Sequence, residues 1–482
     1  MTALVVATDG TVATRGYQEF RQYYPRPGWV EHLPEDIWQA TLAACRQALE
    51  QAGAGARAVT ALGITNQRET AVLWDRATLA APRRAIVWQD RRTARICDEL
   101  RAAGHEDRVS ELTGLRLDPY FTGTKLTWLA VAEPATWAAM ADGSLAAGTV
   151  DSYLIARLTG GKRHVTDASN ASRTLLFDIT AGAWSAELCE LLRVPATALP
   201  EVVPSTGIAG QTDPAAFLGL ELPIAGIAGD QQAALFGQAC FSPGDAKCTY
   251  GTGSFVLANT GGTVARPGNG LLSTVAWMDG TGRLTYALEG SVFVTGAAIQ
   301  WLRDGLGLLD DAAQSEALAA AVPDSGGVVF VPALTGLGAP DWDPDARGAI
   351  FGITRGTTRA HLVRATLEAI AYEVRDVVDV MVTGDWRAGR ALRADGGASA
   401  NGLLMQLQAD QLQIPVERPE IMETTALGAA FLAGMATGVW SSTAELAGTW
   451  RLGQRFEPQA RDDEGHDRWR RAVERAKGWA RG

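Results

Sequence analysis

Hydrophobic residues recur along the chain at the spacings of helices and of strands. The clearest helical stretch has apolar residues separated by steps of four and three: Val363, Leu367, Ile370, Val374, Val377 and Met381. This period places them on one face of an amphipathic helix. In the first half we expect strands at 3–7, 59–64, 85–87 and 221–228, and helices at 35–52 and 91–102. Alternation of this kind is typical of an α/β protein.

The alternation begins again after about residue 240. Strands are expected at 247–250, 254–258, 327–331 and 391–394, and helices at 296–305, from 401 onward and near the C-terminal end. A chain of 482 residues is longer than a single hydrophobic core usually accommodates. We therefore expect two domains of similar size, residues 1–238 and 239–482.

Composition narrows the possible function classes. The hydrophobic content of 47% and charged content of 20% are those of a globular protein. A net charge of −11 argues against nucleic acid as a partner. No apolar run reaches the roughly 20 residues of a membrane span, and the five cysteines lack metal-ligand spacing. We expect a cytoplasmic protein without integral membrane association or a cysteine-bound metal.

Three glycine-containing turns follow strand candidates, at Gly229, at Gly251-Thr252-Gly253 and at Gly396-Gly397. Glycine allows close backbone approach, and exposed N–H groups in such turns can bind phosphate oxygens. These turns suggest a nucleotide-binding cleft. The sequence has no GxxxxGK[ST] motif, so this would not be a P-loop enzyme.

Asp230 stands where an apolar strand gives way to a helix, in IAGDQQAALFGQ (227–238). Two interpretations are open. The carboxylate could cap the first turn of the helix, where it would accept backbone N–H bonds. It could also be a functional group, because a carboxylate in apolar surroundings is costly unless something pairs with it.

Seven segments carry a resemblance to a known family: GITNQRETAVLWDR (63–76), AIVWQDRRT (85–93), DPYFTGTK (118–125), GDQQAALFGQ (229–238), KCTYGTGSF (247–255), TGLGAPDWDPDARGAIFG (335–352) and DGGASAN (395–401). In order and in sequence they resemble the FGGY family of carbohydrate kinases. The resemblance implies an α/β, two-domain, actin-like (ribonuclease H-like) ATPase fold with an interdomain cleft. It also implies ATP-dependent phosphorylation of glycerol to sn-glycerol 3-phosphate, with Mg²⁺ as a second cofactor. Another polyol or a sugar is the alternative substrate.

The resemblance assigns roles at the substrate. Asp230 matches the base that takes the proton from the attacking hydroxyl, since phosphoryl transfer needs mainly positioning, a base and charge stabilisation. Arg68, Glu69 and Tyr120 match residues that bind the hydroxyl groups, and Gln231 lies beside the base. Trp88 and Phe255 match aromatic residues that pack against the carbon chain.

The resemblance also assigns residues to the nucleotide: Gly251, Thr252, Gly253, Gly296, Gln300, Gly397 and Asn401. Gly397 is equally well explained as a glycine at the entry of a helix, and Asn401 as a helix cap. Expected partners are glycerol and ATP or ADP, and the family pattern suggests a homodimer or homotetramer.

One departure from the family pattern concerns the N-terminal strand and its Asp-x-Gly-Thr-Thr phosphate loop. The opening ALVVATDGTVATRGYQEF (3–20) resembles the second strand onward. Either the start is assigned too late, or the loop is lost and the protein is a catalytically impaired binding protein. In both cases we expect lower stability and poorer handling of metal and γ-phosphate. Asp9 is interpreted as a turn residue.

Overall fold

Short strands and helices alternate through the first half of the chain. A computed structural model describes residues 1–266, 270–381 and 390–481. The elements of the first half are β1 Thr2–Val6, β2 Val12–Tyr17, β3 Gln22–Tyr23, β4 Glu31–His32, α1 Pro34–Ala52, η1 Gly53–Ala58, β5 Leu62–Asn66, β6 Val72–Asp75, β7 Ala85–Ile86, α2 Ala94–Ala102, α3 Glu106–Thr113, α4 Thr122–Ala132, α5 Pro134–Ala141, β8 Leu145–Gly148, α6 Val150–Leu158, β9 Val165–Asp167, α7 Ala168–Ala171, β10 Phe177–Asp178, β11 Ala183–Trp184, α8 Ala186–Leu191, η2 Ala196–Ala198, β12 Glu201–Val203, β13 Thr206–Gln211, β14 Pro223–Gly229 and α9 Asp230–Gly237.

The second half contains longer strands and the longest helix. Its elements are β15 Ala246–Tyr250, β16 Ser254–Gly261, β17 Leu272–Met278, β18 Leu284–Val292, α10 Gly296–Asp304, α11 Gln314–Ala320, β19 Val329–Val331, β20 Ala349–Phe351, α12 Arg359–Met381, β21 Leu392–Asp395, η4 Gly397–Ala400, α13 Gly402–Leu412, β22 Val416–Pro419, α14 Thr424–Ala436, α15 Thr443–Ala447, β23 Leu452–Phe456 and α16 Asp463–Ala476.

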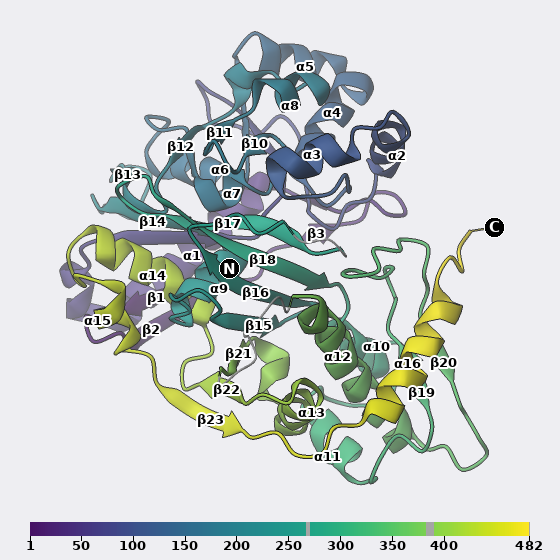
Figure 1. Cartoon of the computed structure of the whole chain (residues 1–482). Coiled ribbons are helices and arrows are strands. Elements are labelled where there is room, and N and C mark those ends of the chain that lie inside the picture. Colours follow the sequence, from purple (N-terminus) through teal and green to yellow (C-terminus); the bar gives the residue numbers. More distant parts are fainter. Residues whose placement is uncertain (267–269, 382–389, 482) are drawn as a thin grey trace.

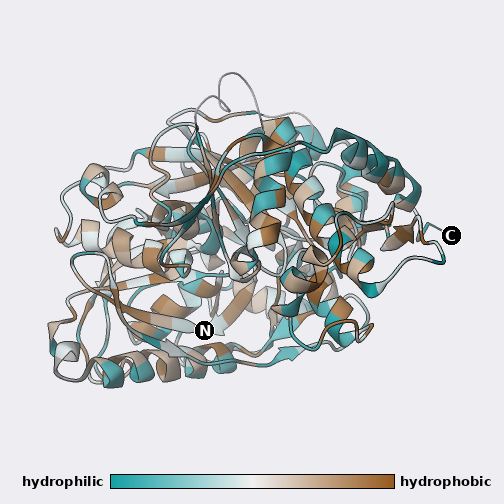
Figure 2. Cartoon of the chain, turned by 90° about the horizontal axis from the view of Figure 1, so that it is seen from below, coloured by the Kyte–Doolittle hydropathy of each residue, from teal (hydrophilic) through white to brown (hydrophobic). Residues whose placement is uncertain are grey.

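A seven-stranded sheet organises the second half, in the order β17-β18-β16-β15-β21-β22-β23. β15 runs parallel to β21, and β21 parallel to β22, while the neighbouring pairs are antiparallel. The apolar face predicted for residues 363–381 lies on α12 and is buried in the largest hydrophobic cluster, together with residues of the sheet and of α13. The predicted helix is therefore confirmed, and the physical reason is its apolar stripe. In Figure 2 the helices at the margin of the molecule alternate between hydrophilic and hydrophobic colours along their length.

In the first half, β14 and β5 run parallel, and β13 pairs antiparallel with β14. β1 and β2 form a separate antiparallel hairpin against α1. Most predicted elements are confirmed, with ends that differ by a few residues. The apolar spacing predicts that the closing helix continues to Ala480, but α16 ends at Ala476 and the next residue, Lys477, is extended.

The two halves of the chain are interleaved in space. α14 follows the last parallel strand of the large sheet, yet it packs against α9, β14, β5 and β1 of the first half (Figure 1). A Cβ atom on Gly428 of α14 would lie 1.8 Å from the carbonyl oxygen of Ala233 on α9. The two helices can approach this closely only because that position is glycine.

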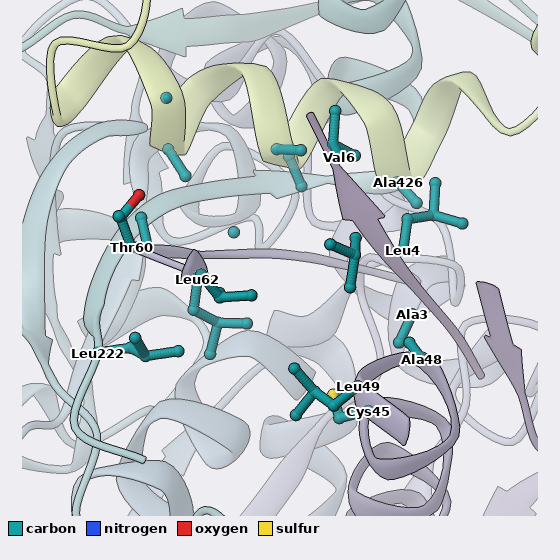
Figure 3. A pocket seen from close by; sticks show the side chains of 18 of the residues that line it. Ala3, Leu4, Val6, Cys45, Ala48, Leu49, Thr60, Leu62, Leu222 and Ala426 are labelled. Carbon is teal, nitrogen blue, oxygen red and sulfur yellow. The ribbon is translucent and has the colours of Figure 1, made fainter. Parts of the chain in front are cut away.

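A cavity of about 680 Å³ separates β1 from β5. In the described part of the chain, β1 pairs only with β2, and β5 pairs only with β14. All of β1 and most of β5 line the cavity, together with residues of α1 and α14. Figure 3 shows apolar side chains turned into it, including Leu4 and Val6 of β1, Leu49 of α1 and Leu62 of β5. Two strand edges therefore face an apolar space of this volume.

Every helix within residues 1–266, 270–381 and 390–481 is too short or too polar to cross a lipid bilayer.

Candidate active site

Asp230 is the first residue of α9 and follows directly on β14. The helix cap is Gly229, whose N–H donates to Ser169 Oγ at 2.9 Å, and no side chain caps this helix. Asp230 is therefore the first helical residue and not the N-cap, although a carboxylate in the first turn suits the helix dipole. Its Oδ1 instead accepts from the N–H of the next residue, Gln231, at 2.8 Å. The Asp230 side chain is 33% exposed, so solvent or a ligand can reach it.

Arg68 reaches Asp230 because their strands are parallel and in register. Gly229 of β14 lies opposite Asn66 of β5, and the carboxyl ends of parallel strands meet at one edge of a sheet. Arg68 Nε is 3.2 Å from Asp230 Oδ1, and Arg68 Nη2 donates to the Tyr120 hydroxyl at 3.2 Å. The Arg68 side chain is 1% exposed, so its guanidinium is engaged mainly by protein groups.

Glu69 adopts a backbone conformation that non-glycine residues rarely occupy, with φ of 59°. The N–H of Thr70 donates to the carbonyl of Arg68 at 2.7 Å and closes a tight turn around Glu69. The buried ammonium of Lys125 donates to the carbonyl oxygens of Tyr120, at 2.5 Å, and of Glu69, at 3.2 Å. Burial lowers the pKa of Lys125 to about 7. Backbone strain supported in this way is typical of functional sites.

Glu69 and Arg68 belong to a buried network of two carboxylates and two guanidiniums. Arg173 Nε donates to Glu69 Oε1 at 2.7 Å, and Arg173 Nη2 donates to Glu289 Oε1 at 2.8 Å. Arg68 Nη1 donates to Glu289 Oε2 at 2.5 Å. All four residues are at most 2% exposed. The pairing satisfies charges that would be costly to bury alone.

Trp88, Tyr120 and Phe255 lie next to this network. The Trp88 ring centroid is 5.6 Å from that of Tyr120 and 6.4 Å from that of Phe255, both in edge-to-face arrangements. The Arg68 guanidinium carbon lies 5.9 Å from the Phe255 centroid. Trp88 and Phe255 are partly exposed, whereas Tyr120 is buried. Two aromatic faces are therefore open beside Arg68.

Gln231 is held by a buried lysine on β15. Lys247 Nζ donates to Gln231 Oε1 at 2.5 Å and to Thr249 Oγ1 at 2.8 Å. Burial lowers the pKa of Lys247, while the carboxylate of Asp395 opposes that shift. This contact joins the large sheet to the first turn of α9.

The acidic groups differ in how readily they ionise. Burial raises the pKa of Asp230, and the charges of Arg68 and Lys247 oppose that shift. Burial also raises the pKa of Glu69, against the charges of Arg68 and Arg173. For Glu289 burial acts in the same direction, but Arg173 and Arg68 outweigh it and lower the pKa to about 2. Asp230 is thus the carboxylate that combines access with an increased proton affinity.

The sequence analysis missed four residues of this region: Lys125, Arg173, Lys247 and Glu289. Lys125 and Lys247 stand inside segments that carried the resemblance. Glu289 stands alone in the apolar strand LTYALEGSV, and an unpaired charge in a buried strand is rare. This single charge was the sequence signal that could have identified Glu289. Arg173, in the loop after α7, gave none.

The turn Gly251-Thr252-Gly253 joins β15 to β16 and meets the start of α10. Gly251 N–H donates to the Gly253 carbonyl at 2.8 Å, and Gly296 N–H donates to the Gly251 carbonyl at 3.0 Å. Thr252 is exposed at this turn. Gln300 is also exposed, one helical turn beyond Gly296. The structure thus brings these five predicted nucleotide residues into one region.

The second glycine turn follows β21. Gly396, at φ of 85°, approaches so closely that a Cβ atom would lie 2.6 Å from the carbonyl oxygen of Tyr250. Gly397 is exposed, and a Cβ atom there would meet no neighbour. The structural requirement for glycine therefore falls on Gly396, not on the predicted Gly397. Asn401 caps α13, since its Oδ1 accepts from Leu404 N–H at 2.9 Å.

These features define a class of α/β protein in which parallel strands bring a carboxylate and a guanidinium together beside a second sheet with open glycine turns. Family models then identify the chain. The N-terminal domain of the FGGY family of carbohydrate kinases matches residues 1–237, and its C-terminal domain matches residues 246–437. The chain belongs to the FGGY family of carbohydrate kinases.

Relatives of known name cover nearly the whole chain. A glycerol kinase of Aromatoleum aromaticum is 56% identical over 99% of this chain and 96% of that protein. Glycerol kinase 2 of Thermotoga maritima is 53% identical over the same shares. Among solved structures, Plasmodium falciparum glycerol kinase with ADP has a TM-score of 0.86 at 34% identity, covering 98% of this chain and 96% of that one. Xylulose kinase from Rhodospirillum rubrum has a TM-score of 0.82 at 27% identity, covering 98% and 95%.

Proposed function

We propose that this chain transfers the γ-phosphoryl group of ATP to glycerol, forming sn-glycerol 3-phosphate, with Asp230 as the general base. One observation supports this more than any other. Asp230 is a partly exposed carboxylate beside Arg68, at the carboxyl ends of two parallel strands, in a chain whose full-length relatives include named glycerol kinases.

The contacts of Asp230 suggest how it would act. Both of its close contacts, from Arg68 Nε and from Gln231 N–H, use Oδ1. Within the residues that the structure describes, Oδ2 accepts no hydrogen bond. We assign Oδ2 as the atom that takes the proton from the attacking primary hydroxyl, while Arg68 fixes the direction of the carboxylate. A raised pKa suits this task because a stronger base accepts the proton more readily.

The other predicted substrate residues would orient the alcohol. The open faces of Trp88 and Phe255 would pack against its carbon chain. Arg68, Glu69 and Tyr120 offer donors and acceptors that suit hydroxyl groups. In the described conformation these three are engaged with protein partners, so a bound alcohol would replace or share some of those bonds. Gln231, fixed by Lys247, would hold the first turn of α9.

For the nucleotide we propose the predicted residues Gly251, Thr252, Gly253, Gly296, Gln300, Gly397 and Asn401. The fit is supported by Gly397, where the backbone is open, and by the exposed turn at Thr252. Bound ATP would supply the phosphoryl group, and Mg²⁺ would neutralise its charge. In the described ranges no group of three or more His, Cys, Asp or Glu side chains could hold a metal ion by itself. We therefore expect Mg²⁺ to bind together with the phosphates.

We further propose that the cavity between β1 and β5 is the position of the strand and phosphate loop that the family pattern adds to this domain. Two strand edges line it without a partner strand among the described residues. An extended apolar segment placed there would bond to both edges and join the hairpin to the β13-β14-β5 sheet. This proposal agrees with the absence of an Asp-x-Gly-Thr-Thr motif from the sequence.

A substrate panel tests the proposed function. ADP formation is measured with ATP and glycerol, xylulose or a four-carbon polyol, each over a range of concentrations. We expect the highest kcat/KM with glycerol. A higher kcat/KM with xylulose would show that the preferred substrate is a sugar and not glycerol. Calorimetric binding of ATP and glycerol without turnover would instead favour the impaired binding protein.

A further inference from the structure

Glu289 lies at the centre of the buried charge network and comes from a different sheet than its partners. It is a residue of β18, and its side chain is fully buried. Its Oε2 accepts from Arg68 Nη1 at 2.5 Å, and its Oε1 accepts from Arg68 Nη2 at 3.1 Å. This two-point pairing matches the planar geometry of guanidinium and carboxylate. Glu289 thereby makes the only two-point contact that the described residues offer the Arg68 guanidinium, beside single bonds to Gln232 Oε1 and the Tyr120 hydroxyl.

The pairing decides what Arg68 presents to Asp230. With Nη1 and Nη2 bound to Glu289, Arg68 Nε pairs with the carboxylates of Asp230, at 3.2 Å, and of Glu69, at 3.6 Å. Arg173 Nη2 donates to Glu289 Oε1 at 2.8 Å, the oxygen that also accepts from Arg68 Nη2. The family models place Arg68 and Arg173 in the N-terminal domain and Glu289 in the C-terminal domain. The network thus crosses from one domain to the other at the base.

The charged groups near Asp230 can be named element by element. The segment after β5 supplies Arg68 and Glu69, the loop after α7 supplies Arg173, and the large sheet supplies Lys247 and Glu289. Among the described residues, the buried hydroxyl of Tyr120 and the carboxylate of Asp395, which acts on Lys247, are further titratable groups of this region. The elements β14, β16, β17 and α14 contain no charged residue. The charge that Asp230 experiences is therefore set by this small group.

We propose that Glu289 is a positioning residue of the reaction, holding the Arg68 guanidinium toward Asp230 and offsetting its positive charge so that Asp230 stays basic. Arg173 acts in the opposite direction, because it offsets the charge of Glu289. This inference rests on Asp230 being the base. The contact between Glu289 and Arg68 joins the two domains. It sets the proton affinity of Asp230 only when the domains are in the described arrangement.

The proposal predicts shifts of opposite sign for two variants. In Glu289→Gln the charge of Arg68 is no longer offset, so Asp230 ionises more readily. The acid limb of the kcat/KM pH profile should then move to lower pH by about one unit, and kcat should fall because the base is weaker. In Arg173→Gln a positive charge is removed, so the acid limb should move to higher pH.

The experiment compares pH profiles of kcat/KM for glycerol phosphorylation in the full chain. Glu373→Gln is the control for substituting a buried glutamate: Glu373 lies on α12 outside the network, and burial raises its pKa, so this variant leaves the charge around Asp230 unchanged. Its acid limb should coincide with that of the unmodified chain. Arg173→Lys keeps the positive charge but cannot reproduce the two contacts of Arg173 with Glu69 and Glu289. The acid limb of its pH profile should therefore stay in place even where kcat falls. This variant separates a charge effect from a packing effect if Glu289→Gln folds poorly.

Two outcomes would overturn the proposal: unchanged acid limbs in both Glu289→Gln and Arg173→Gln, or shifts in the same direction. Asp230→Asn separates this failure from failure of the proposed function. If Asp230→Asn abolishes turnover while the limbs do not move, Asp230 remains the base and Glu289 does not adjust it. If Asp230→Asn retains turnover, the base assignment fails first.

Discussion

At the residue scale, the two oxygens of Asp230 have different surroundings. Oδ1 is bound by Arg68 Nε and by the N–H of Gln231, whereas Oδ2 accepts no hydrogen bond from the described residues. A carboxylate held by one oxygen keeps its direction without losing its function as an acceptor. Because burial raises its pKa, the protonated, inactive form persists above the usual range of aspartate. Turnover should therefore rise with pH through the acid limb.

Replacing the base gives the most direct test at this scale. We expect Asp230→Asn to lower kcat by about 10²–10⁴, the usual effect of removing a positioned base, because the amide cannot accept the proton. The KM for glycerol should change far less. Steady-state ADP release measures both constants.

Asp9→Asn is the control for this prediction. Asp9 is an exposed turn residue whose Oδ1 accepts from the N–H and the hydroxyl of Thr11. Its replacement should leave kcat unchanged. A comparable loss of kcat in Asp9→Asn, or near-normal turnover in Asp230→Asn, would contradict the assignment.

At the residue scale, residues predicted from long sequence motifs lie close together in the structure, while their roles remain predictions. Asp230, Arg68 and Tyr120 were predicted in this way. In the structure, the Arg68 guanidinium lies within hydrogen-bond distance of both Asp230 and Tyr120. The structure places Asp230 one residue after the N-cap, Gly229, because the register of β14 and β5 sets where the helix begins. The glycine requirement at Gly396 depends on the approach of Tyr250, which no local pattern reveals.

At the element scale, the hairpin β1-β2 is incompletely integrated into its domain. Its free edge and that of β5 face the same apolar cavity. Unpaired edges and unfilled apolar volume both reduce stability. The cavity is therefore the element-level feature with the largest expected effect on folding.

Filling the cavity should stabilise the protein. An extension ahead of Met1, made of a two-residue turn and about six apolar, β-branched residues, has the length of a typical strand. Such a segment would fold back along the free edge of β1 and pair with it. We expect a higher Tm and slower amide hydrogen exchange in β1 and β5.

An extension of the same length made of glycine and serine is the control, because it can enter the space without filling it. It should leave Tm and hydrogen exchange unchanged. Equal behaviour of the two extended chains would show that the cavity does not accept a strand.

At the scale of the whole molecule, two of the contacts that join the halves of the chain bear directly on Asp230. One is the Arg68–Glu289–Arg173 network, and the other is the crossing of α9 and α14 at Gly428. Both lie close to Asp230, since α9 begins with that residue. The relative position of the two halves and the geometry of the base are thus coupled. The domain division at residues 238/239 stays a prediction. The homodimer or homotetramer also stays a prediction, and sedimentation velocity would measure the oligomeric state.

A substitution at the helix crossing tests this coupling. In Gly428→Ala the new Cβ would lie 1.8 Å from the Ala233 carbonyl oxygen, so α14 must move away from α9. Overpacking of this kind costs about 1–3 kcal/mol. We expect a lower Tm and a lower kcat, because α9 carries the base. Gly262→Ala, where a Cβ would meet no neighbour, should change neither quantity. Loss of Tm without any change in kcat would argue against the coupling.

The sequence by itself determined the α/β character, most of the helices and strands, and the motifs that contain Asp230, Arg68 and the glycine turns. These depend on periodicity and on short-range preferences, which are written locally in the chain. Only the tertiary structure decided which charges meet, because Arg68 and Glu289 are 221 positions apart and their contact requires two sheets to pack. It likewise decided the return of α14 to α9 and the volume between β1 and β5. Such features arise from the register and packing of distant segments, and no local pattern encodes them.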